Sequence, residues 1–535
     1  MNFFRKTIYT AVALTSSAML GACDSFLQEY SQDLAKVESW EDLDELLVGE
    51  AYFQSGAFDF YEGGDTGENI DFLHFMSDEV TMTGGFEMDG SGYYSQMFPY
   101  YTWQADTGMD NKFNYKGGDE STFNLLYKKI NVCNSVISLI DDQPVSDPVY
   151  DPVQKRRVKG EAQFLRAFYY FMLTNLYAEP YSPSTASSTP GIPLKYTENV
   201  EDVEFLRNSL SECYARIIED LQNAMSNLDG ITKQSVHFAD RRAAEMLLAR
   251  VYLYMQDHKN AAAHAQAVID ADKSLIDLRS VSKGEPTLVI SNPEIIFSMG
   301  SYEIAYAFNN NEDYWYNCIP LIEISGDMID LFSSNDLRST RYIGKTELGG
   351  YDRAFIKYSG LSSTYGQWFQ TGSVFTLRTS EAYLILAEAQ AMLGKDSEAV
   401  STLRTFLSKR MSGDYTIPEG GEELVSFIRD ENAREFLIEG HRWFDLRRYT
   451  VDAKYPWSKE ISHPYPYQDD YEFDRFDWYR LEKNDAAYTM PIPRKIIQFQ
   501  ILLGTVARPD RKLYDTTYEM WYGDDDDDYD DDDDY

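Results

Sequence analysis

Helical periodicity runs through most of this chain and restricts the folds open to it more than any other feature. Between Arg157 and Tyr177, apolar residues recur at alternating steps of four and three, which places them along one side of a helix of about five turns. These residues are Val158, Ala162, Leu165, Tyr169, Met172 and Leu176. The pattern predicts a long core helix that ends before Pro180, followed by a surface loop over residues 182–193, which are rich in Pro, Ser and Thr.

Two later segments share a helix-turn-helix pattern. The first has helical periods over residues 241–255 and 260–270, and the second over 377–393 and 397–410. Alignment of the two segments pairs Ala249 with Ala387 and Ala261 with Ala399, and small residues at such positions let antiparallel helices approach closely. Tetratricopeptide repeats, with about 34 residues per unit, are built in this way. We therefore predict a mainly α fold with a tetratricopeptide-like helical repeat scaffold.

The region between the two repeats, residues 275–375, has a different pattern. It combines Gly and Pro with dense aromatic residues and with short apolar runs at 287–290 and 294–297. This composition predicts a loop-rich, partly β insertion region with a few short strands. Loops on a rigid frame often carry binding residues.

The N-terminus predicts export and lipid attachment. Basic Arg5 and Lys6 precede an apolar stretch over residues 8–20, which is too short to span a bilayer and ends in small residues, as signal peptides do. Cys23 follows Leu20-Gly21-Ala22, an order similar to the lipobox of bacterial lipoproteins, whose cysteine receives acyl chains. We expect residues 1–22 to be a lipoprotein signal peptide and the mature protein to be anchored to a membrane through Cys23.

Charge excludes several classes of partner. The chain carries 48 basic and 88 acidic residues, a net charge of −40, so it should repel nucleic acid and polyanionic substrates. Residues 516–535 end in a run of aspartates with no apolar period, which predicts a disordered acidic tail. A calcium-binding tail is the alternative, but the run lacks the spacing of an EF-hand loop.

The motifs of common enzymes and metal sites do not occur in the sequence. HExxH, GxSxG, GxxxxGK[ST] and GxGxxG are all missing, and Cys133, Cys213 and Cys318 have no CxxC spacing. We therefore expect no cofactor and no metal site. A glycosidase needs only two carboxylates, so the sequence alone leaves a surface hydrolase open.

One segment is specific enough to indicate a family. Residues 428–449, IRDENAREFLIEGHRWFDLRRY, resemble the signature of the SusD/RagB family, surface lipoproteins of Bacteroidetes that capture nutrients for a TonB-dependent outer-membrane transporter. Further matching positions are 23–27, Tyr127, Ile130, Asn134, 166–170, 176–177, 248–253, 377–378, 381–384, 387–389 and 491–493. After Pro493 the chain departs from the family pattern, with RKIIQFQILLG and the aspartate tail.

The charges of this segment admit two interpretations. Arginines alternate with acids at spacings of three and four, which favours ion pairs along a helix while Phe436 and Trp443 are buried. A catalytic role for Glu439 or His441 is the alternative. We favour the structural network, since no second His or Cys at metal-binding spacing lies nearby.

Two loop regions combine aromatic rings with hydrogen-bonding groups, as a sugar site requires. They cover residues 78–103 and 301–316, and the resemblance implies a ligand site built by loops at roughly these places. We predict stacking by Tyr93, Tyr94, Tyr306 and Trp315 and polar contacts from Asp78 and Asn309, with Trp368 as a further candidate.

The resemblance implies a non-catalytic, glycan-binding lipoprotein at the cell surface, anchored in the outer membrane and partnered with a SusC-like TonB-dependent transporter. Peptide binding of the RagB type, a surface glycoside hydrolase and a purely structural interaction protein are the alternatives. The expected division is a signal peptide (1–22), a SusD-like N-terminal part (23–230), a RagB/SusD C-terminal part with repeats and loops (231–515) and the tail (516–535).

Overall fold

The computed structural model describes residues 37–53, 70, 72–83, 93–199, 203–299, 322–344, 353–358, 371–372, 374–469 and 472–518. The α-helices are α3 (Trp40–Leu46), α4 (Phe72–Met76), α5 (Tyr93–Tyr101), α6 (Glu120–Leu139), α7 (Asp151–Tyr177), α8 (Leu210–Asn227), α9 (Arg241–Tyr254), α10 (His258–Ala271), α12 (Gly326–Ile329), α13 (Thr379–Met392), α14 (Asp396–Leu407), α15 (Gly421–Glu435), α16 (Arg442–Thr450) and α17 (Arg494–Phe499). The strands are β1 (Val80–Met82), β2 (Ile295–Met299), β3 (Ile322–Ile324), β4 (Ile343–Gly344), β5 (Ala354–Phe355), β6 (Phe375–Arg378), β7 (Ile461–Asp469), β8 (Glu472–Leu481) and β9 (Asp515–Thr517). Short 3₁₀ or π turns are η2 (Leu47–Ala51), η3 (Ile140–Asp142), η4 (Leu278–Ser280), η5 (Leu337–Thr340), η6 (Ala486–Tyr488) and η7 (Ile501–Leu503).

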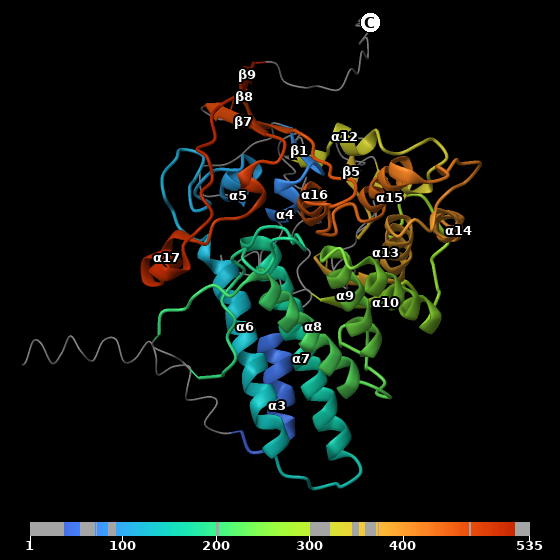
Figure 1. The fold of residues 1–535 in the computed structure, drawn as a ribbon. Coiled ribbons are helices and arrows are strands. Elements are labelled where there is room, and N and C mark those ends of the chain that lie inside the picture. Colours follow the sequence, from blue (N-terminus) through green and yellow to red (C-terminus); the bar gives the residue numbers. More distant parts are fainter. Residues whose placement is uncertain are drawn as a thin grey trace, which may run out of the picture.

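The fold is mainly α-helical, as predicted, and its frame is a succession of packed helices (Figure 1). Helix α7 packs against α6 and α8, α8 against α9, and the hairpins α9–α10 and α13–α14 meet through α10 and α13. These hairpins are the two predicted helix-turn-helix segments. The second begins later than expected, because Leu377 and Arg378 belong to β6, which pairs antiparallel with β2. No helix in the described residues is long and apolar enough to cross a membrane.

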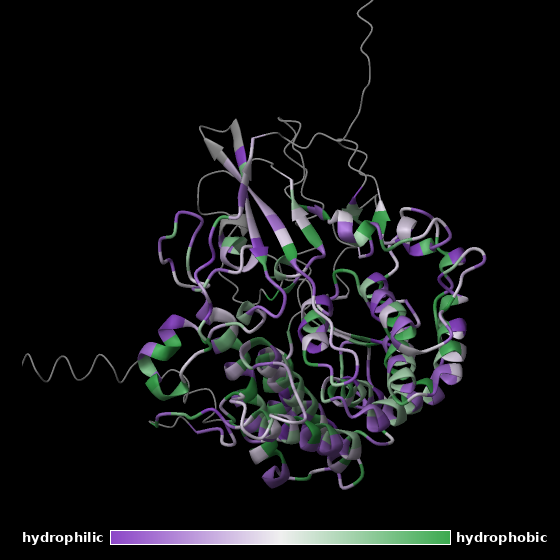
Figure 2. Ribbon diagram, turned by 45° about the horizontal axis from the view of Figure 1, so that its top comes forward, coloured by the Kyte–Doolittle hydropathy of each residue, from purple (hydrophilic) through white to green (hydrophobic). Residues whose placement is uncertain are grey.

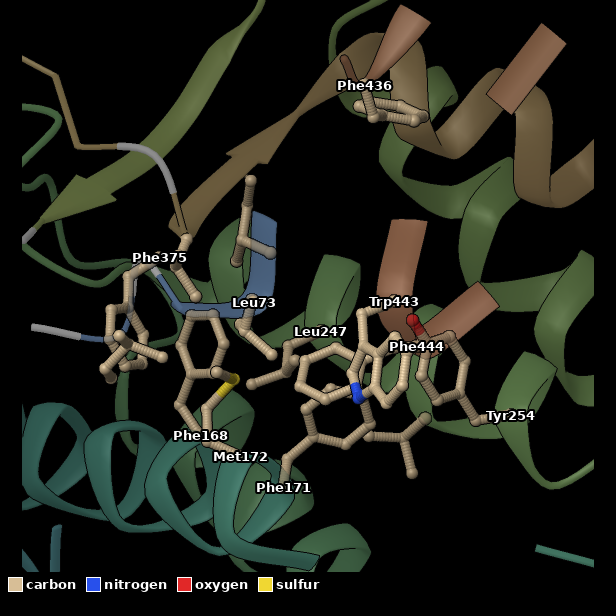
Figure 3. Packing of buried hydrophobic residues seen from close by; sticks show 14 of the residues in the cluster. Leu73, Phe168, Phe171, Met172, Leu247, Tyr254, Phe375, Phe436, Trp443 and Phe444 are labelled. Atoms are coloured by element: carbon tan, nitrogen blue, oxygen red, sulfur yellow. The ribbon is translucent and has the colours of Figure 1, made fainter. Parts of the chain in front are cut away.

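Helix α7 is buried on more sides than its predicted apolar stripe requires. Residues outside the stripe, including Phe168 and Phe171, are also inaccessible to solvent. Figure 3 shows them packed with Met172 from the same helix, Leu247 of α9 and Trp443 of α16. The predicted apolar stripe was too narrow, because other helices pack on several sides of α7. The helix lies at the centre of the core and not at its edge.

The insertion region contributes short strands, as predicted. Of the two apolar runs, the second is confirmed as β2, whereas residues 287–290 form no strand. The backbone N–H groups of Thr287 and Leu288 both donate to the carbonyl oxygen of Lys357, each at 2.9 Å. In a β-strand the N–H groups of successive residues point to opposite edges, so two neighbouring residues cannot donate to the same carbonyl oxygen. Residues 287 and 288 therefore do not belong to a strand ladder.

The segment with the family resemblance forms two helices and not one. Helix α15 ends at Glu435 and α16 begins at Arg442, and the turn between them places Ile438 at φ +55° and Gly440 at φ +76°. A positive φ is uncommon for a β-branched residue, and the surroundings must hold it in place. Here the Ile438 N–H donates to Oε1 of buried Glu79 at 2.7 Å.

Charged side chains from several elements meet beneath this turn in what we call the buried ionic cluster. Its members are Glu294, Asp336, Arg338, Lys357, Arg378, Arg410, Glu431, Glu435 and Glu439, all buried. Glu435 accepts from Arg378 at 3.0 Å and from Arg410 at 2.9 Å, and both arginines also reach Glu294. Burial alone would raise the pKa of Glu435, but Arg410 and Arg378 outweigh it and hold that pKa well below its usual range. The cluster joins α15 to β6, to the residue before β2 and to the segment after α14.

Most ion pairs of this segment are long-range and not within a helix, which corrects the sequence interpretation. Only Arg434 with Glu431 and Arg448 with Asp445 pair at a spacing of three. By contrast, Arg442 pairs with Asp78 across 364 positions, and Arg448 also pairs with Glu388 of α13.

The C-terminal part adds an antiparallel sheet in the order β7-β8-β9, which the sequence analysis did not predict. It lies at the top of the molecule in Figure 1, next to α5. The segment after Pro493 forms α17 and η7 and exposes Phe499 and Ile501, and α17 carries strongly hydrophobic residues in Figure 2.

Removal of one anion from the buried ionic cluster should be strongly destabilising. Glu435→Gln leaves Arg378 and Arg410 short of a counter-charge in a buried site, which we expect to lower the free energy of unfolding by about 3–5 kcal/mol. Glu422→Gln, at an exposed position of the same helix, should change it by less than about 0.5 kcal/mol. Urea denaturation followed by circular dichroism measures both, and equal effects of the two substitutions would contradict the role given to the cluster.

Asp119, just before α6, predicts a pH effect on stability. Burial, with the nearby carboxylates of Asp106 and Glu120, raises its pKa to about 6 from 3.8. A raised pKa in the folded state means that stability is lost as pH rises through that interval and stays lost above it. Asp119→Asn should therefore be more stable than the parent at pH 7.5 and equal to it at pH 3.5. Melting temperatures across this range provide the test, with exposed Asp142→Asn as the variant expected to show no such trend.

Candidate functional site

The structure describes few of the side chains predicted to bind a ligand. Tyr306, Asn309 and Trp315 lie outside the described residues, as do Trp368 and the proposed lipid-bearing Cys23. Tyr93 and Tyr94 form the first turn of α5, but their side chains also lie outside the described part. Their roles therefore stay predictions.

Asp78 is fully described, and its carboxylate is bound within the protein. The side chain is buried and accepts from Arg442 at 2.6 and 2.8 Å and from Lys459 at 2.7 Å. Burial would raise the pKa of Asp78, but the charges of Arg442 and Lys459 outweigh it and hold the pKa far below its usual range. A ligand hydroxyl at Asp78 would have to compete with these two cations. The contact that the structure shows instead joins the segment before β1 to α16.

Next to α5 the structure shows a set of rings that sequence analysis did not single out. We call Phe98, Phe113, Tyr465, Tyr467 and Tyr479 the aromatic platform. The ring of Phe98, on α5, lies edge-on to Phe113 at 5.6 Å, to Tyr465 at 4.8 Å and to Tyr479 at 5.8 Å. Phe98 is buried, whereas the outermost ring, Phe113, is 54% exposed.

A tight turn presents Phe113 to solvent. Oδ1 of Asp110 accepts from the N–H groups of Lys112 and Asn114 at 2.9 and 2.8 Å, and the Phe113 N–H donates to the Asp110 carbonyl at 3.0 Å. Phe113 has φ +60°, a left-handed conformation that is unusual for a bulky residue. Strained backbone of this kind tends to occur at functional sites, because the surrounding structure must maintain it.

The β7–β8 hairpin fixes this turn from the other side. The Asn111 amide donates to the hydroxyl of Tyr465 at 3.2 Å, and the Tyr467 hydroxyl donates to the Asn111 carbonyl at 3.2 Å. The guanidinium of Arg475 lies over the ring of Tyr467, 4.8 Å from its centroid, and its Nε donates to Asp477 at 2.9 Å. The arginine side chain is 33% exposed, so it adds a charged donor beside the platform.

This arrangement has the chemical features of a sugar-binding surface. An exposed ring offers a stacking face to the C–H groups of a pyranose, while a guanidinium can donate to its hydroxyl groups. The turn at 110–114 could have been inferred from its Asp and Asn residues. Its neighbours Tyr467 and Arg475 follow in the chain by more than 350 positions, and no local pattern connects them to it.

The histidines near the family segment and the platform are placed as packing residues. His441 stacks on Phe436 at 4.3 Å, and burial together with Arg250 and Arg378 lowers its pKa well below the usual value. His463 lies between the rings of Tyr101 and Trp103 at 4.2 and 4.4 Å, and burial lowers its pKa to about 4. Both imidazoles are therefore neutral near pH 7.

Glu439, the other catalytic candidate, is part of the buried ionic cluster. It pairs with Lys357 and accepts from Arg378 at 2.8 and 2.7 Å. This placement agrees with the structural interpretation of the segment. Within the described ranges, no group of three or more His, Cys, Asp or Glu side chains is arranged to hold a metal ion.

Comparison with known proteins agrees with this architecture. Residues 73–253 match a family described as starch-binding and associating with the outer membrane, and residues 341–501 match the SusD family. A SusD-like protein of Formosa agariphila is 20% identical over a match of 507 residues. The match covers 84% of this chain and 92% of that protein.

Solved structures share the fold along most of the chain. A SusD superfamily protein of Bacteroides thetaiotaomicron superposes with a TM-score of 0.65 at 19% identity, covering 88% of this chain and 100% of the other. A SusD-like carbohydrate-binding protein of Bacteroides vulgatus gives 0.65 at 20% identity, covering 87% and 97%. At these identities the structures establish the fold, and the two family matches together span more than half of the sequence. The chain belongs to the SusD family.

Proposed function

We propose that this protein binds oligosaccharides or polysaccharides at the cell surface, without cleaving them, for import through a SusC-like TonB-dependent transporter. The observation that carries the proposal is the exposed ring of Phe113, held on a strained turn beside Tyr467 and Arg475. A ring that is exposed and also fixed in place loses little conformational freedom when a ligand stacks on it.

Two further observations support a glycan as the ligand. Solved structures with the same fold are described as carbohydrate-binding and sugar-binding proteins, and one matching family is described as starch-binding. The net charge of −40 disfavours polyanionic ligands, whereas neutral sugars are unaffected by it. The proposed ligand is therefore a neutral or weakly cationic glycan.

The loops identified from the sequence extend the proposed site. Tyr93 and Tyr94 begin the helix whose second half carries Phe98 of the platform, so a ligand on Phe113 could extend toward them. Tyr306, Asn309 and Trp315 remain in the proposal as contacts from the insertion region. Asp78 remains only as a contact made through competition with Arg442 and Lys459.

We also propose that Cys23 carries the lipid that anchors the protein in the outer membrane, with the body on the outer face. Family membership and the sequence around Cys23 support this location. Several acyl chains would hold the protein durably at the surface, since each buried methylene adds about 0.8 kcal/mol of membrane affinity.

Removal of the exposed ring tests the site. Phe113→Ala should weaken binding to the best glycan found on an array by about tenfold, because stacking area is lost at the centre of the contact. Phe113→Tyr keeps a stacking face and should bind like the parent. Phe499→Ala removes an 81% exposed ring elsewhere and should leave affinity unchanged. Isothermal titration calorimetry measures all three, and melting temperatures verify that the variants are folded.

The outcomes separate the possible functions. Full glycan affinity in Phe113→Ala, with loss in Tyr93→Ala or Trp315→Ala, would move the site to the sequence-predicted loops and keep the function. Binding of peptide mixtures without glycan binding would support the RagB-like alternative. Sugar products released during incubation would identify a hydrolase and overturn the non-catalytic proposal.

The lipid anchor makes a separate prediction. Cys23→Ala should abolish incorporation of labelled palmitate and release the protein from the membrane fraction, because the thiol is the acylation site. In the parent, protease added to intact cells should degrade the protein. Resistance of the parent in intact cells, with degradation after lysis, would place it inside the cell envelope and contradict the surface location.

A further inference from the structure

The connection between α6 and α7 exposes an unusual number of apolar side chains. Val145 is 49% exposed, Val149 80%, Tyr150 54% and Val153 39%, and Pro144, Pro148 and Pro152 are exposed among them. We call residues 144–153 the apolar tip. Figure 1 shows it at the lower end of the helical frame, at the opposite end of the molecule from α5 and the β7–β8 hairpin.

The exposure of the apolar tip is built into its backbone. Oδ2 of Asp151 accepts from the N–H groups of Ser146 and Asp147 at 2.6 and 2.8 Å, and Oδ1 of Asp147 accepts from Val149 and Tyr150 at 2.8 and 3.0 Å. Both carboxylates are thus hydrogen-bonded to backbone N–H groups of the loop itself. The side chains of Val145, Val149 and Val153 are exposed, so the fold maintains an apolar surface where a loop would ordinarily be polar.

The chain enters the described structure beside this tip. Trp40, in the first turn of α3, lies edge-on to Tyr150 at 6.0 Å, and Asp44 of the same helix pairs with Arg157 of α7 at 2.5 Å. The first described residue is Val37, and the proposed lipid-bearing Cys23 is 14 positions before it. A chain of that length spans at most about 45 Å, and about 20 Å on average when flexible.

The charge near the apolar tip is closer to neutral than that of the rest of the protein, which suits contact with a lipid surface. Residues 141–159 contain four aspartates, at 141, 142, 147 and 151, and four bases, at 155, 156, 157 and 159, so the segment has no net charge within a chain of −40. Lys159 pairs with Asp141, and Lys155 donates to the carbonyls of Asp141 and Gln143. A nearly neutral, apolar end can approach a bilayer that the acidic remainder would avoid.

The geometry points to the apolar tip as a membrane-contact surface: Val145, Val149 and Tyr150 insert into the interfacial region of the bilayer that holds the lipid anchor. This contact goes beyond glycan binding and rests only on the proposed anchor at Cys23. Apolar side chains and a tyrosine at the headgroup level are the residues that interfacial contacts use. The tip would then hold the body upright, with the aromatic platform directed away from the membrane.

Depth-dependent quenching on the lipidated full chain tests the contact. An environment-sensitive fluorophore is attached at Val149→Cys or, as the matched control, at Leu206→Cys, which is 64% exposed. Both variants carry Cys318→Ser, and Cys133 and Cys213 are buried and unreactive to the label. The protein is bound to phosphatidylethanolamine–phosphatidylcholine vesicles containing nitroxide-labelled lipid. We expect at least about threefold stronger quenching at position 149 than at 206, and a loss of this difference when Val145→Asp is added.

Equal quenching at the two positions would overturn the inference, as would quenching at 149 that survives Val145→Asp. A change in fluorescence at 149 that depends on protein density but not on the nitroxide lipid would assign the tip to a second copy of the chain instead. A chain that fails to attach to vesicles would contradict the anchor and this inference together. Glycan affinity is independent of all these readouts, so the proposed function is tested separately.

Discussion

The structure depends above all on the buried ionic cluster around Glu435. Charges removed from water cost several kcal/mol each, and only a complete set of partners recovers that cost. Glu435 meets this requirement with Arg338, Arg378 and Arg410, which come from the insertion region, from β6 and from the segment after α14. Segments that are far apart in the sequence are thereby held at one place. The cluster explains why the family segment is so rich in charge although most of it is buried.

The helical frame and the C-terminal hairpin together place the aromatic platform. Helix α5 supplies Phe98 as a buried base, the turn at 110–114 raises Phe113 above it, and β7 and β8 supply the remaining rings. These elements are connected through hydrogen bonds of Asn111 to two tyrosines of β7. The exposed ring is therefore positioned by residues far apart in the chain, and its orientation does not depend on the loop alone.

Much of the frame could be predicted from the sequence, because helical period and small residues are local signals. The hairpins α9–α10 and α13–α14 follow from them almost to the residue. The β7–β8 hairpin could have been found from its alternating pattern, with Ile461, His463 and Tyr465 on one face, but the polar and proline residues between them obscured it. The partners of Arg442 and Arg448 could not be found, since no local pattern indicates contacts with Asp78 and Glu388. The turn of Phe113 could be inferred locally, but no local pattern connects it to Tyr467 and Arg475.

The ion pair between Asp78 and Arg442 also has a consequence for biogenesis. The partners are separated by 364 residues, and the N–H of Ile438 reaches back similarly far to Glu79. A polypeptide that emerges from a ribosome or a translocation channel N-terminus first therefore exposes these acids, with the apolar β1 beside them, until nearly the whole chain has followed. Such a chain cannot complete its core piece by piece during synthesis. It should need protection by chaperones until its last hundred or so residues arrive, and truncation from the C-terminal side should abolish folding and not merely shorten the product.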